Sequence, residues 1–507
     1  MTELTLNTLE QVTRGRIRRG ERLFDLSAPT VIGQIATDSR HVLPGDVFWA
    51  LSGERHDGAS FIAQAFARGA AGVVTQNSGI AVPADRWLLE VDDSLAALTR
   101  VASWKREQFN GQVVAITGSV GKSSTREMLN SILRQRLVGV ASPRSFNNQL
   151  GLPLSMLELA ERMDYALFEL GASHGGEIAQ LAELCQPQIG IITGIGDAHF
   201  GEFGGYEAIA AAKCELLARL APGGLAILNA DCDRLRRATA GWCGRKFTFG
   251  RSPDADVRAT DVEYNDGRLS FCVAGEHYEV PAWGRHQLTV ALAAIAGAKA
   301  FGISRQEIRD GLAAFEPLAH RSTVRQIGEF TVIDDCYNAS PMAMQAALGL
   351  LRETTTHGRK IAVLGDMLEL GDSASSFHRL LGDLVVTQSG ADVLIACGEF
   401  SDEVAAAAQS AGMRADRVHC CTSVETAWQT LQSIVKAGDA VLVKASRAVG
   451  LEKLIAALEA EHEFAHAHTT NHESTNRFPT PRGVTRTFGA PSLVPSLREP
   501  GTAHPPG

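Results

Sequence analysis

One segment in the first half of the chain restricts the fold more than any other feature. It reads VVAITGSVGKSSTREMLNSILRQ, the pattern of a buried strand, a glycine loop and a helix. Gly118 and Gly121 let backbone N–H groups turn inward on phosphate oxygens, and the N-terminus of the following helix favours negative charge. Lys122 is expected to reach the β- and γ-phosphates of ATP, and the Ser123 hydroxyl is expected to bind Mg2+.

This loop is shorter than the common phosphate-binding motif. Gly118 stands only three residues before Gly121, and Ile116 occupies the place of the usual first glycine. A glycine turn with an ordinary surface lysine is the alternative, but strand, loop, Lys-Ser and helix all occur in the expected order. The residues expected to contact ATP are Thr117, Gly118, Ser119, Val120, Gly121, Lys122, Ser123 and Ser124.

A second glycine pair does not predict a nucleotide site. Gly194 and Gly196 resemble half of a dinucleotide fingerprint, but the third glycine and the following acidic residue are missing. NAD is therefore not expected as a cofactor.

Strands alternate with helices along most of the chain, which predicts an α/β fold with mostly parallel sheets. At about 150 residues per domain, 507 residues predict three domains. The expected boundaries are 1–108, 109–317 and 318–463. Residues 464–507 are rich in Pro, Thr, Ser and Gly without a hydrophobic period, so they are expected to be a disordered tail.

Composition excludes several other classes of protein. Hydrophobic residues make up 45% and charged residues 21%, which is typical of a soluble globular chain. The net charge of -9 provides no basic field to attract nucleic acid or anionic membranes. Nine cysteines without a C-x-x-C indicate reduced thiols in the cytoplasm. We expect a monomer without signal peptide or membrane span.

Three polar residues outside the loop are candidates for the same site. Glu169 and His199 lie at or just after the ends of expected parallel strands, where open α/β sheets keep their ligand sites. A carboxylate such as Glu169 suits Mg2+, which prefers oxygen ligands. Taken alone, Glu169 could equally be a solvated strand end and His199 a structural residue. Lys213, in the helical segment AIAAAKCELLARL, reads by itself as a solvated lysine.

Together the motifs resemble the Mur ligase family, ATP-dependent amide-forming enzymes of peptidoglycan precursor synthesis. The resemblance spans roughly residues 30 to 460 and includes ITGSVGKSST, SFNNQLGLPLSML, TGIGDAHFGEFGG, AAAKCELL, DDCYNASPMAMQAAL, LGDMLELG and LVKASRAVGLE. It implies an α/β N-terminal domain that holds a UDP-sugar and a central P-loop ATPase-like domain that binds ATP. A Rossmann-like C-terminal domain would position ATP and the incoming amino component.

The resemblance also implies roles for single residues. Ser39 and Arg40 would lie near the nucleotide diphosphate of the UDP-sugar, and Asn147 and Asn148 near the phosphates and the acyl substrate. The implied metal ligands are Ser123, Glu169, His199 and Lys213, with Lys213 carrying a carbamate that helps to hold a second Mg2+. The implied catalytic residues are Lys122, His199 and Lys213. The C-terminal residues implied to close over ATP are Arg321, Asp335, Tyr337 and Asn338.

The segments DDCYNASP and LGDMLELG are similar to the branch of the family that joins D-alanyl-D-alanine to UDP-N-acetylmuramoyl-tripeptide. The implied reaction activates the tripeptide carboxylate with the γ-phosphate of ATP, and the dipeptide amine then attacks the acyl phosphate. The same mechanism with another amino acid is one alternative. A catalytically inactive ATP-binding relative is another, suggested by Gln287 and Val290, which replace asparagines that help to hold adenine in the family.

Overall fold

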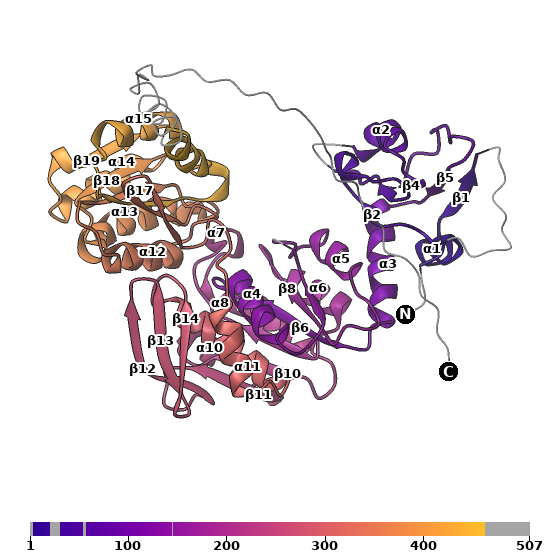
Figure 1. Ribbon diagram of the computed structural model, residues 1–507, viewed down its shortest axis with the longest axis horizontal. Helices are drawn as coiled ribbons and strands as arrows, with labels where there is room; N and C mark the ends of the chain where they lie inside the picture. Colours follow the sequence, from indigo (N-terminus) through magenta and orange to yellow (C-terminus); the bar gives the residue numbers. More distant parts are fainter. Residues whose placement is uncertain (1–3, 21–30, 54–56, 144, 462–507) are drawn as a thin grey trace, which may run out of the picture. The chain divides into compact units, whose positions relative to one another are not determined.

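The computed structural model of the protein describes residues 4–20, 31–53, 57–143 and 145–461 (Figure 1). The tail expected to be disordered, 464–507, lies outside the described residues. Three separate sheets follow one another along the chain, each with helices from the same part of the sequence. The expected three-domain α/β fold with mostly parallel sheets is confirmed.

The N-terminal sheet has five strands in the order β1-β5-β4-β3-β2. Its strands are β1 (Arg16–Arg19), β2 (Ile35–Ala36), β3 (Val47–Trp49), β4 (Gly72–Thr75) and β5 (Trp87–Glu90), and its helices are α1 (Leu6–Thr13), α2 (Ile62–Ala67) and α3 (Ser94–Glu107). Only β1 pairs in the antiparallel direction. The buried Trp49 indole donates to the Ser94 carbonyl at 2.8 Å, which ties β3 to the start of α3.

The central sheet has nine strands in the order β14-β13-β12-β11-β10-β9-β6-β8-β7. They are β6 (Gln112–Thr117), β7 (Gly139–Ala141), β8 (Tyr165–Glu169), β9 (Ile189–Ile192), β10 (Leu225–Asn229), β11 (Arg245–Gly250), β12 (Val257–Asn265), β13 (Arg268–Val273) and β14 (Glu276–Pro281). Pairings from β7 to β12 are parallel, whereas β12, β13 and β14 form an antiparallel meander. Strands β8 and β9 are buried along their whole length, which explains their continuous apolar runs.

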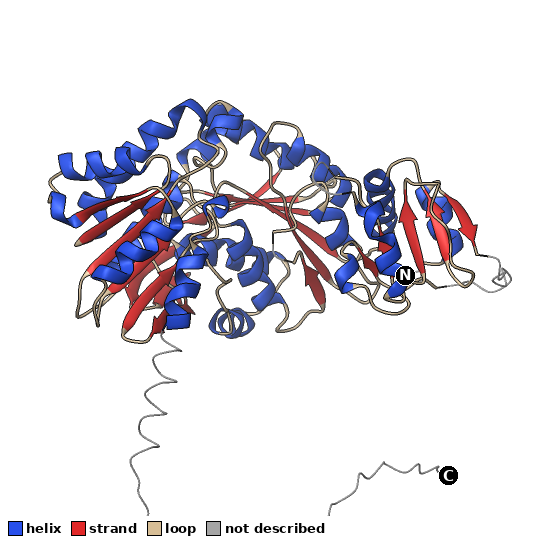
Figure 2. Cartoon of the chain, turned by 90° about the horizontal axis from the view of Figure 1, so that it is seen from above, coloured by secondary structure: helices blue, strands red, loops and turns tan. Residues whose placement is uncertain are grey.

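Helices cover the central sheet, as the blue and red segments of Figure 2 show. They are α4 (Lys122–Leu133), α5 (Gly151–Met156), α6 (Glu177–Cys185), α7 (Phe200–Phe203), α8 (Tyr206–Ala218), α9 (Asp233–Ala238), α10 (Gln287–Ala300) and α11 (Arg305–Ala313). Helix α10 is apolar on nearly all sides because it packs between α4 and strands β10 to β12. Among the described residues, no helix has the length and apolar character needed to cross a membrane.

The third sheet has the order β15-β16-β20-β17-β18-β19. Its strands are β15 (Thr323–Ile327), β16 (Phe330–Asp334), β17 (Lys360–Gly365), β18 (Val393–Cys397), β19 (Val418–Cys421) and β20 (Ala440–Lys444), and its helices include α12 (Pro341–Glu353), α13 (Ala374–Leu384), α14 (Ser401–Ser410) and α15 (Val424–Ile434). All neighbours except β15 and β16 pair in parallel. The loops that follow β16 and β20 therefore leave the same sheet edge side by side.

Two helices of the central domain approach so closely that only glycine fits between them. A Cβ added to Gly311 of α11 would lie 2.3 Å from the Cα of Ile132 in α4. The Ser131 hydroxyl of α4 also donates to the Gly311 carbonyl at 2.7 Å. Because the obstacle is backbone, neither helix can relieve the collision by a side-chain rotation.

We expect Gly311→Ala to lower the free energy of unfolding by about 1–3 kcal/mol, since the added methyl must push α11 away from α4. Urea denaturation followed by circular dichroism measures this change. Gly349→Ala is the matched control, because Gly349 lies in α12 with no atom within 4 Å of an added Cβ. Its expected effect is a gain of about 0.5–1 kcal/mol from helix propensity. Equal losses in both variants would contradict the close packing.

Candidate active site

The loop after β6 has the form expected from its glycines. Gly118 and Gly121 have φ angles of 141° and 81°, in the region that favours glycine. A Cβ at Gly118 would lie 2.1 Å from the Thr193 hydroxyl oxygen, so the loop passes directly against the residue that follows β9. Gly121 is the N-cap of α4, and the helix therefore presents its unpaired N–H groups to the loop.

Lys122 holds a positive charge inside this loop. Its ammonium group donates to the Gly118 carbonyl at 2.9 Å. Burial lowers the pKa of Lys122, the Glu169 carboxylate raises it, and the Arg321 guanidinium lowers it again. A desolvated cation beside a helix N-terminus is stabilised when an anion such as a phosphate binds.

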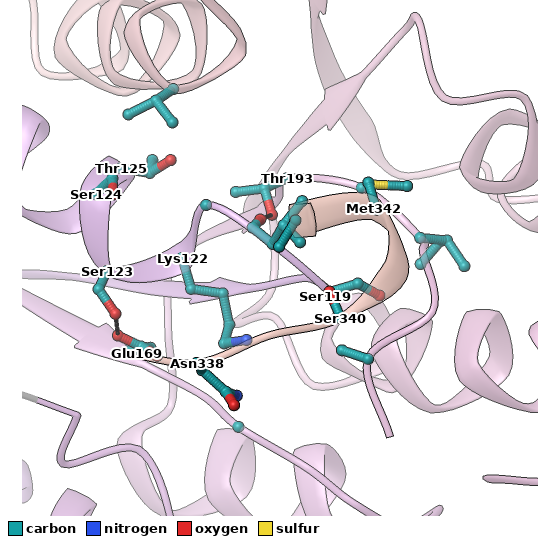
Figure 3. Close-up of a pocket in the computed structure, with 18 of the residues that line it drawn as sticks. Ser119, Lys122, Ser123, Ser124, Thr125, Glu169, Thr193, Asn338, Ser340 and Met342 are labelled. Atoms are coloured by element: carbon teal, nitrogen blue, oxygen red, sulfur yellow. Dashed lines mark hydrogen bonds between the residues drawn. The ribbon is translucent and has the colours of Figure 1, made fainter. Parts of the chain in front are cut away.

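Three polar side chains contact the carboxylate of Glu169, at the end of β8. The Ser123 hydroxyl donates to its Oε2 at 2.6 Å (Figure 3). The Asn147 amide donates to its Oε1 at 2.8 Å. The guanidinium of Arg126, which is fully buried, lies 3.4 Å from the same Oε2 and also pairs with Glu127. A serine hydroxyl and a carboxylate therefore meet at the end of β8, and both are oxygen donors of the kind that Mg2+ prefers.

His199 is held by a residue from the third domain. Its Nδ1 lies 2.7 Å from Glu369 Oε2 and 3.4 Å from the Ser173 hydroxyl. The hydrogen bond to His199 lowers the pKa of Glu369. Both His199 and Glu369 have positive φ angles, 58° and 65°, which are uncommon for residues with a side chain. The contact orients the imidazole through Nδ1 and leaves Nε2 as the nitrogen available for a ligand.

Lys213 lies in α8 with 1% of its surface exposed. Its ammonium group donates to the Ala172 carbonyl at 3.1 Å, and the Phe203 ring lies 5.1 Å away. Burial lowers the pKa of Lys213 to about 7, and the charge of Lys122 contributes to the shift. A substantial fraction of this amine is therefore neutral and nucleophilic near neutral pH. The reading of Lys213 as a solvated lysine is wrong, because the packing of α8 removes it from water.

A cavity of about 1120 Å³ joins the loop to residues of the third domain. The residues singled out from the sequence that line it are Ser119, Val120, Gly121, Lys122, Ser123, Ser124, Asn147, Asn148, Glu169, His199, Arg321, Asp335, Tyr337 and Asn338. Thr117, Gly118 and Lys213 are not among the residues that line it. Most of the residues expected from the sequence therefore line one cavity.

Ser39 and Arg40 are not part of this cavity. They lie in a short 3-10 helix of the N-terminal domain, Ser39–His41. The Ser39 hydroxyl donates to Gln64 Oε1 at 2.7 Å, and the exposed Arg40 pairs with Asp38. The hydrogen bonds from Arg40 hold the pKa of the Asp38 carboxyl well below its usual range.

Lys444 is a cavity residue to which sequence reasoning gave no role. It is 2% exposed, and its ammonium group donates to Asp335 Oδ2 at 2.6 Å and to the Asn338 carbonyl at 2.9 Å. Asp335 also accepts from the Ser322 backbone N–H at 2.8 Å. The sequence did contain a signal for Lys444, because this residue is the last of the apolar strand AVLVK, just as Glu169 is the last of YALFE. Lys444 thus fixes the loop that carries Asp335 and Asn338.

The two residues that replace family asparagines both line the cavity. Gln287 is 6% exposed, and its Nε2 lies 3.3 Å from His286 Nε2. Its Oε1 is buried and has no hydrogen-bond partner among the described residues. Val290 is 5% exposed and offers only methyl groups. Compared with two asparagines, Gln287 keeps one side-chain amide on this wall of the cavity, and Val290 offers none.

Three family models match the chain. The Mur ligase family catalytic domain matches residues 31–134, the Mur ligase middle domain matches 116–298, and the Mur ligase glutamate ligase domain matches 320–447.

Curated relatives match over nearly their full length. A UDP-N-acetylmuramoyl-tripeptide–D-alanyl-D-alanine ligase of Bacillus subtilis is 32% identical over 90% of this chain and 98% of its own. A ligase of the same name from Synechocystis is 36% identical over 86% of this chain and 94% of its own.

Solved structures agree with these relatives. A crystal structure of MurF from Acinetobacter baumannii has a TM-score of 0.78 and 32% identity, and covers 90% of this chain and 98% of its own. The MurF ligase of Thermotoga maritima, solved in complex with ADP, has a TM-score of 0.72 and 28% identity over 85% of this chain and 98% of its own.

We expect Gly118→Ala to weaken ATP binding by about tenfold or more, because the new methyl collides with Thr193 and displaces the loop. Equilibrium titration with a fluorescent ATP analogue measures the affinity. Gly412→Ala is the control, since Gly412 has a φ of 112° but no atom within 4 Å of an added Cβ. It imposes similar backbone strain away from the cavity. An unchanged affinity in Gly118→Ala would contradict the expected phosphate contact.

Proposed function

The chain belongs to the Mur ligase family, and we propose that it joins D-alanyl-D-alanine to UDP-N-acetylmuramoyl-tripeptide with hydrolysis of ATP, in peptidoglycan precursor synthesis. One observation carries the proposal. The phosphate loop with Lys122 lines the same cavity as Arg321, Asp335 and Asn338 of the third domain. Relatives that bear the name of this activity match 86–90% of the chain.

The loop supplies the groups that the first step needs. Its backbone N–H groups and the start of α4 bind phosphate oxygens, and Lys122 offsets the charge of the transferring γ-phosphoryl group. An oxygen of the tripeptide carboxylate attacks the γ-phosphorus, the bond to ADP breaks, and an acyl phosphate forms. The protein contributes position and charge rather than a covalent nucleophile.

The second step forms the amide bond. The neutral amine of the dipeptide attacks the acyl carbon, and inorganic phosphate leaves with its electron pair while the amine loses a proton. We place Asn147 and Asn148 next to the acyl group. Asn147 is held by Glu169, and the Asn148 side-chain oxygen accepts from the Gly151 N–H at 2.8 Å, so both side chains are oriented before substrate binds.

The donor set supports a magnesium site. We propose that Ser123, Glu169 and His199 hold Mg2+, with Ser123 and Glu169 already within 2.6 Å of one another. When bound there, Mg2+ neutralises phosphate charge. His199 is suited to the task because Glu369 holds its Nδ1 and leaves Nε2 available.

We further propose that Lys213 carries a carbamate. The lone pair of the neutral amine attacks carbon dioxide and the nitrogen loses a proton, which converts the neutral amine into an anionic carbamate with oxygen atoms suited to a second Mg2+. The pKa of about 7 supports this chemistry, because only the neutral amine reacts.

Roles for the other domains complete the proposal. We assign the UDP-sugar to residues 1–108, where Ser39 and Arg40 lie on one turn of 3-10 helix. Arg321, Asp335, Tyr337 and Asn338 of residues 318–463 are assigned to ATP, opposite the phosphate loop of residues 109–317.

Purified protein is expected to release phosphate and form the UDP-linked pentapeptide when it is given ATP, Mg2+, UDP-N-acetylmuramoyl-tripeptide and D-alanyl-D-alanine. Lys122→Ala is expected to lower the rate at least about a hundredfold, because the charge that stabilises the transferring phosphoryl group is lost. Phosphate release and product mass are measured together. Lys246→Ala removes an exposed lysine of β11 outside the cavity and should keep the full rate. No product from the wild type would refute the ligase and favour an inactive ATP-binding relative.

Lys213→Ala is expected to abolish turnover while the fold, followed by circular dichroism, remains. Nuclear magnetic resonance with 13C-labelled carbon dioxide should reveal a carbamate carbon in the wild type and none in this variant. Its intensity should rise as the pH increases through about 7, because deprotonation supplies the reactive amine. Lys105→Ala is the control, since burial also lowers the pKa of Lys105, which lies in α3, donates to the Leu159 carbonyl and has no proposed role in metal binding. A wild-type rate in Lys213→Ala would refute the carbamate.

A further inference from the structure

The ring of Tyr337 is close to two arginines that come from different parts of the third domain. The guanidinium carbon of Arg321, which precedes β15, lies 4.0 Å from the centre of the Tyr337 ring. That of Arg447, which follows β20, lies 5.6 Å from the same ring. Strands β16 and β20 are parallel neighbours, and this pairing brings the loops of Tyr337 and Arg447 together at one sheet edge.

Both guanidinium groups lack an acidic partner within the described part of the chain. No carboxylate there lies within 4.0 Å of Arg321 or Arg447. The nearby Asp335 is already neutralised by Lys444 at 2.6 Å. Two positive charges on one aromatic ring repel each other, so the arrangement becomes favourable when anions bind to them.

The two arginines face different surroundings. Arg321 lines the same cavity as Lys122 and the phosphate loop, and we assign it to the phosphates of ATP. Arg447 is exposed and does not line the cavity, although its platform Tyr337 does. Arg447 therefore stands at the edge of the cavity, where a second and separate anion can reach it.

The backbone that carries Arg447 is anchored. The Ser446 N–H donates to the Asp366 carbonyl at 3.0 Å, and the Ser446 hydroxyl accepts from the Leu368 N–H at 2.9 Å. The Val449 N–H closes the turn on the Ser446 carbonyl at 3.0 Å. A fixed backbone and a stacking ring reduce the entropy that the arginine loses when it binds a ligand.

We propose that Arg447 binds the terminal carboxylate of the incoming dipeptide, with Tyr337 as its platform. This inference rests on the proposed ligase function. A guanidinium fork matches a carboxylate in a bidentate manner. A dipeptide spans at most about 7 Å, so a carboxylate held at Arg447 leaves the amine to point past Tyr337 into the cavity where the acyl phosphate forms. Arg447 thereby selects a free carboxylate at the end of the amino component.

Steady-state kinetics with D-alanyl-D-alanine and with its C-terminal amide test the assignment. A charge-assisted hydrogen bond changes affinity by about ten- to hundredfold. We expect Arg447→Ala to raise the KM for the dipeptide at least about tenfold while kcat and the KM values for ATP and UDP-N-acetylmuramoyl-tripeptide stay within about twofold. The wild type should discriminate against the amide by a similar factor, and Arg447→Ala should lose this discrimination. Arg447→Lys should recover part of it.

The control is Arg414→Ala, which removes an exposed arginine paired with Asp416 and should leave all three KM values unchanged. A rise confined to the KM for ATP or for the nucleotide tripeptide would assign Arg447 to that anion and overturn the proposal. Equal use of dipeptide and amide by the wild type would overturn it too. If the wild type forms no pentapeptide at all, the proposed ligase function is wrong. The wild type is therefore assayed before any variant is compared with it.

Discussion

The close approach of Gly118 to Thr193 is the contact on which the site depends. It brings the loop after β6 against the end of β9, its neighbour in the parallel sheet. The Thr193 hydroxyl donates to the Val120 carbonyl at 2.6 Å, and the Ser119 N–H donates to the Gly194 carbonyl at 3.0 Å. These two bonds, one in each direction, hold the loop on the neighbouring strand end, and the N–H groups at the start of α4, which have no partner within the helix, remain for an anion.

Burial also changes the pKa of the lysine side chains in this region. Lys122 and Lys213 both have lowered pKa values because burial disfavours their charged forms, and each is affected by other cations nearby. Glu169 is surrounded by polar groups, since Ser123 and Asn147 donate hydrogen bonds to its carboxylate and Arg126 lies 3.4 Å from it. The net charge of -9 has little bearing on this region, because charges at short range in a poorly solvated cavity outweigh the distant field.

Contacts between the central and third domains involve residues of the candidate active site and their neighbours in the chain. Asp197, two residues before His199, accepts from the N–H of Met342 at 3.2 Å, in the first turn of α12. Glu369 holds His199, and the Tyr337 hydroxyl is hydrogen-bonded to Ser145. Each of these contacts uses a loop that also reaches the cavity. Several of the residues that we propose for anion binding therefore belong to the segments that bring the two domains together.

Local patterns in the sequence were enough to predict the glycine loop between β6 and α4, the α/β class and the place of Glu169 at a strand end. Their physical basis lies within a few residues: glycine conformations, apolar runs and the start of a helix. The same reasoning gave the wrong environment for Lys213. The composition of its segment indicates a helix surface and does not show which residues pack against α8. It also passed over Lys444, whose partner Asp335 lies 109 residues away.

The sequence by itself determined the glycine loop between β6 and α4 that we propose as the phosphate site, because that loop is built from consecutive residues. Only the tertiary structure decided the lowered pKa of Lys213, the pairing of Lys444 with Asp335, and the stacking of Arg321 and Arg447 on Tyr337. Those properties arise from burial and from the order of strands in a sheet. Both depend on contacts between residues far apart in the chain, which a local pattern does not specify.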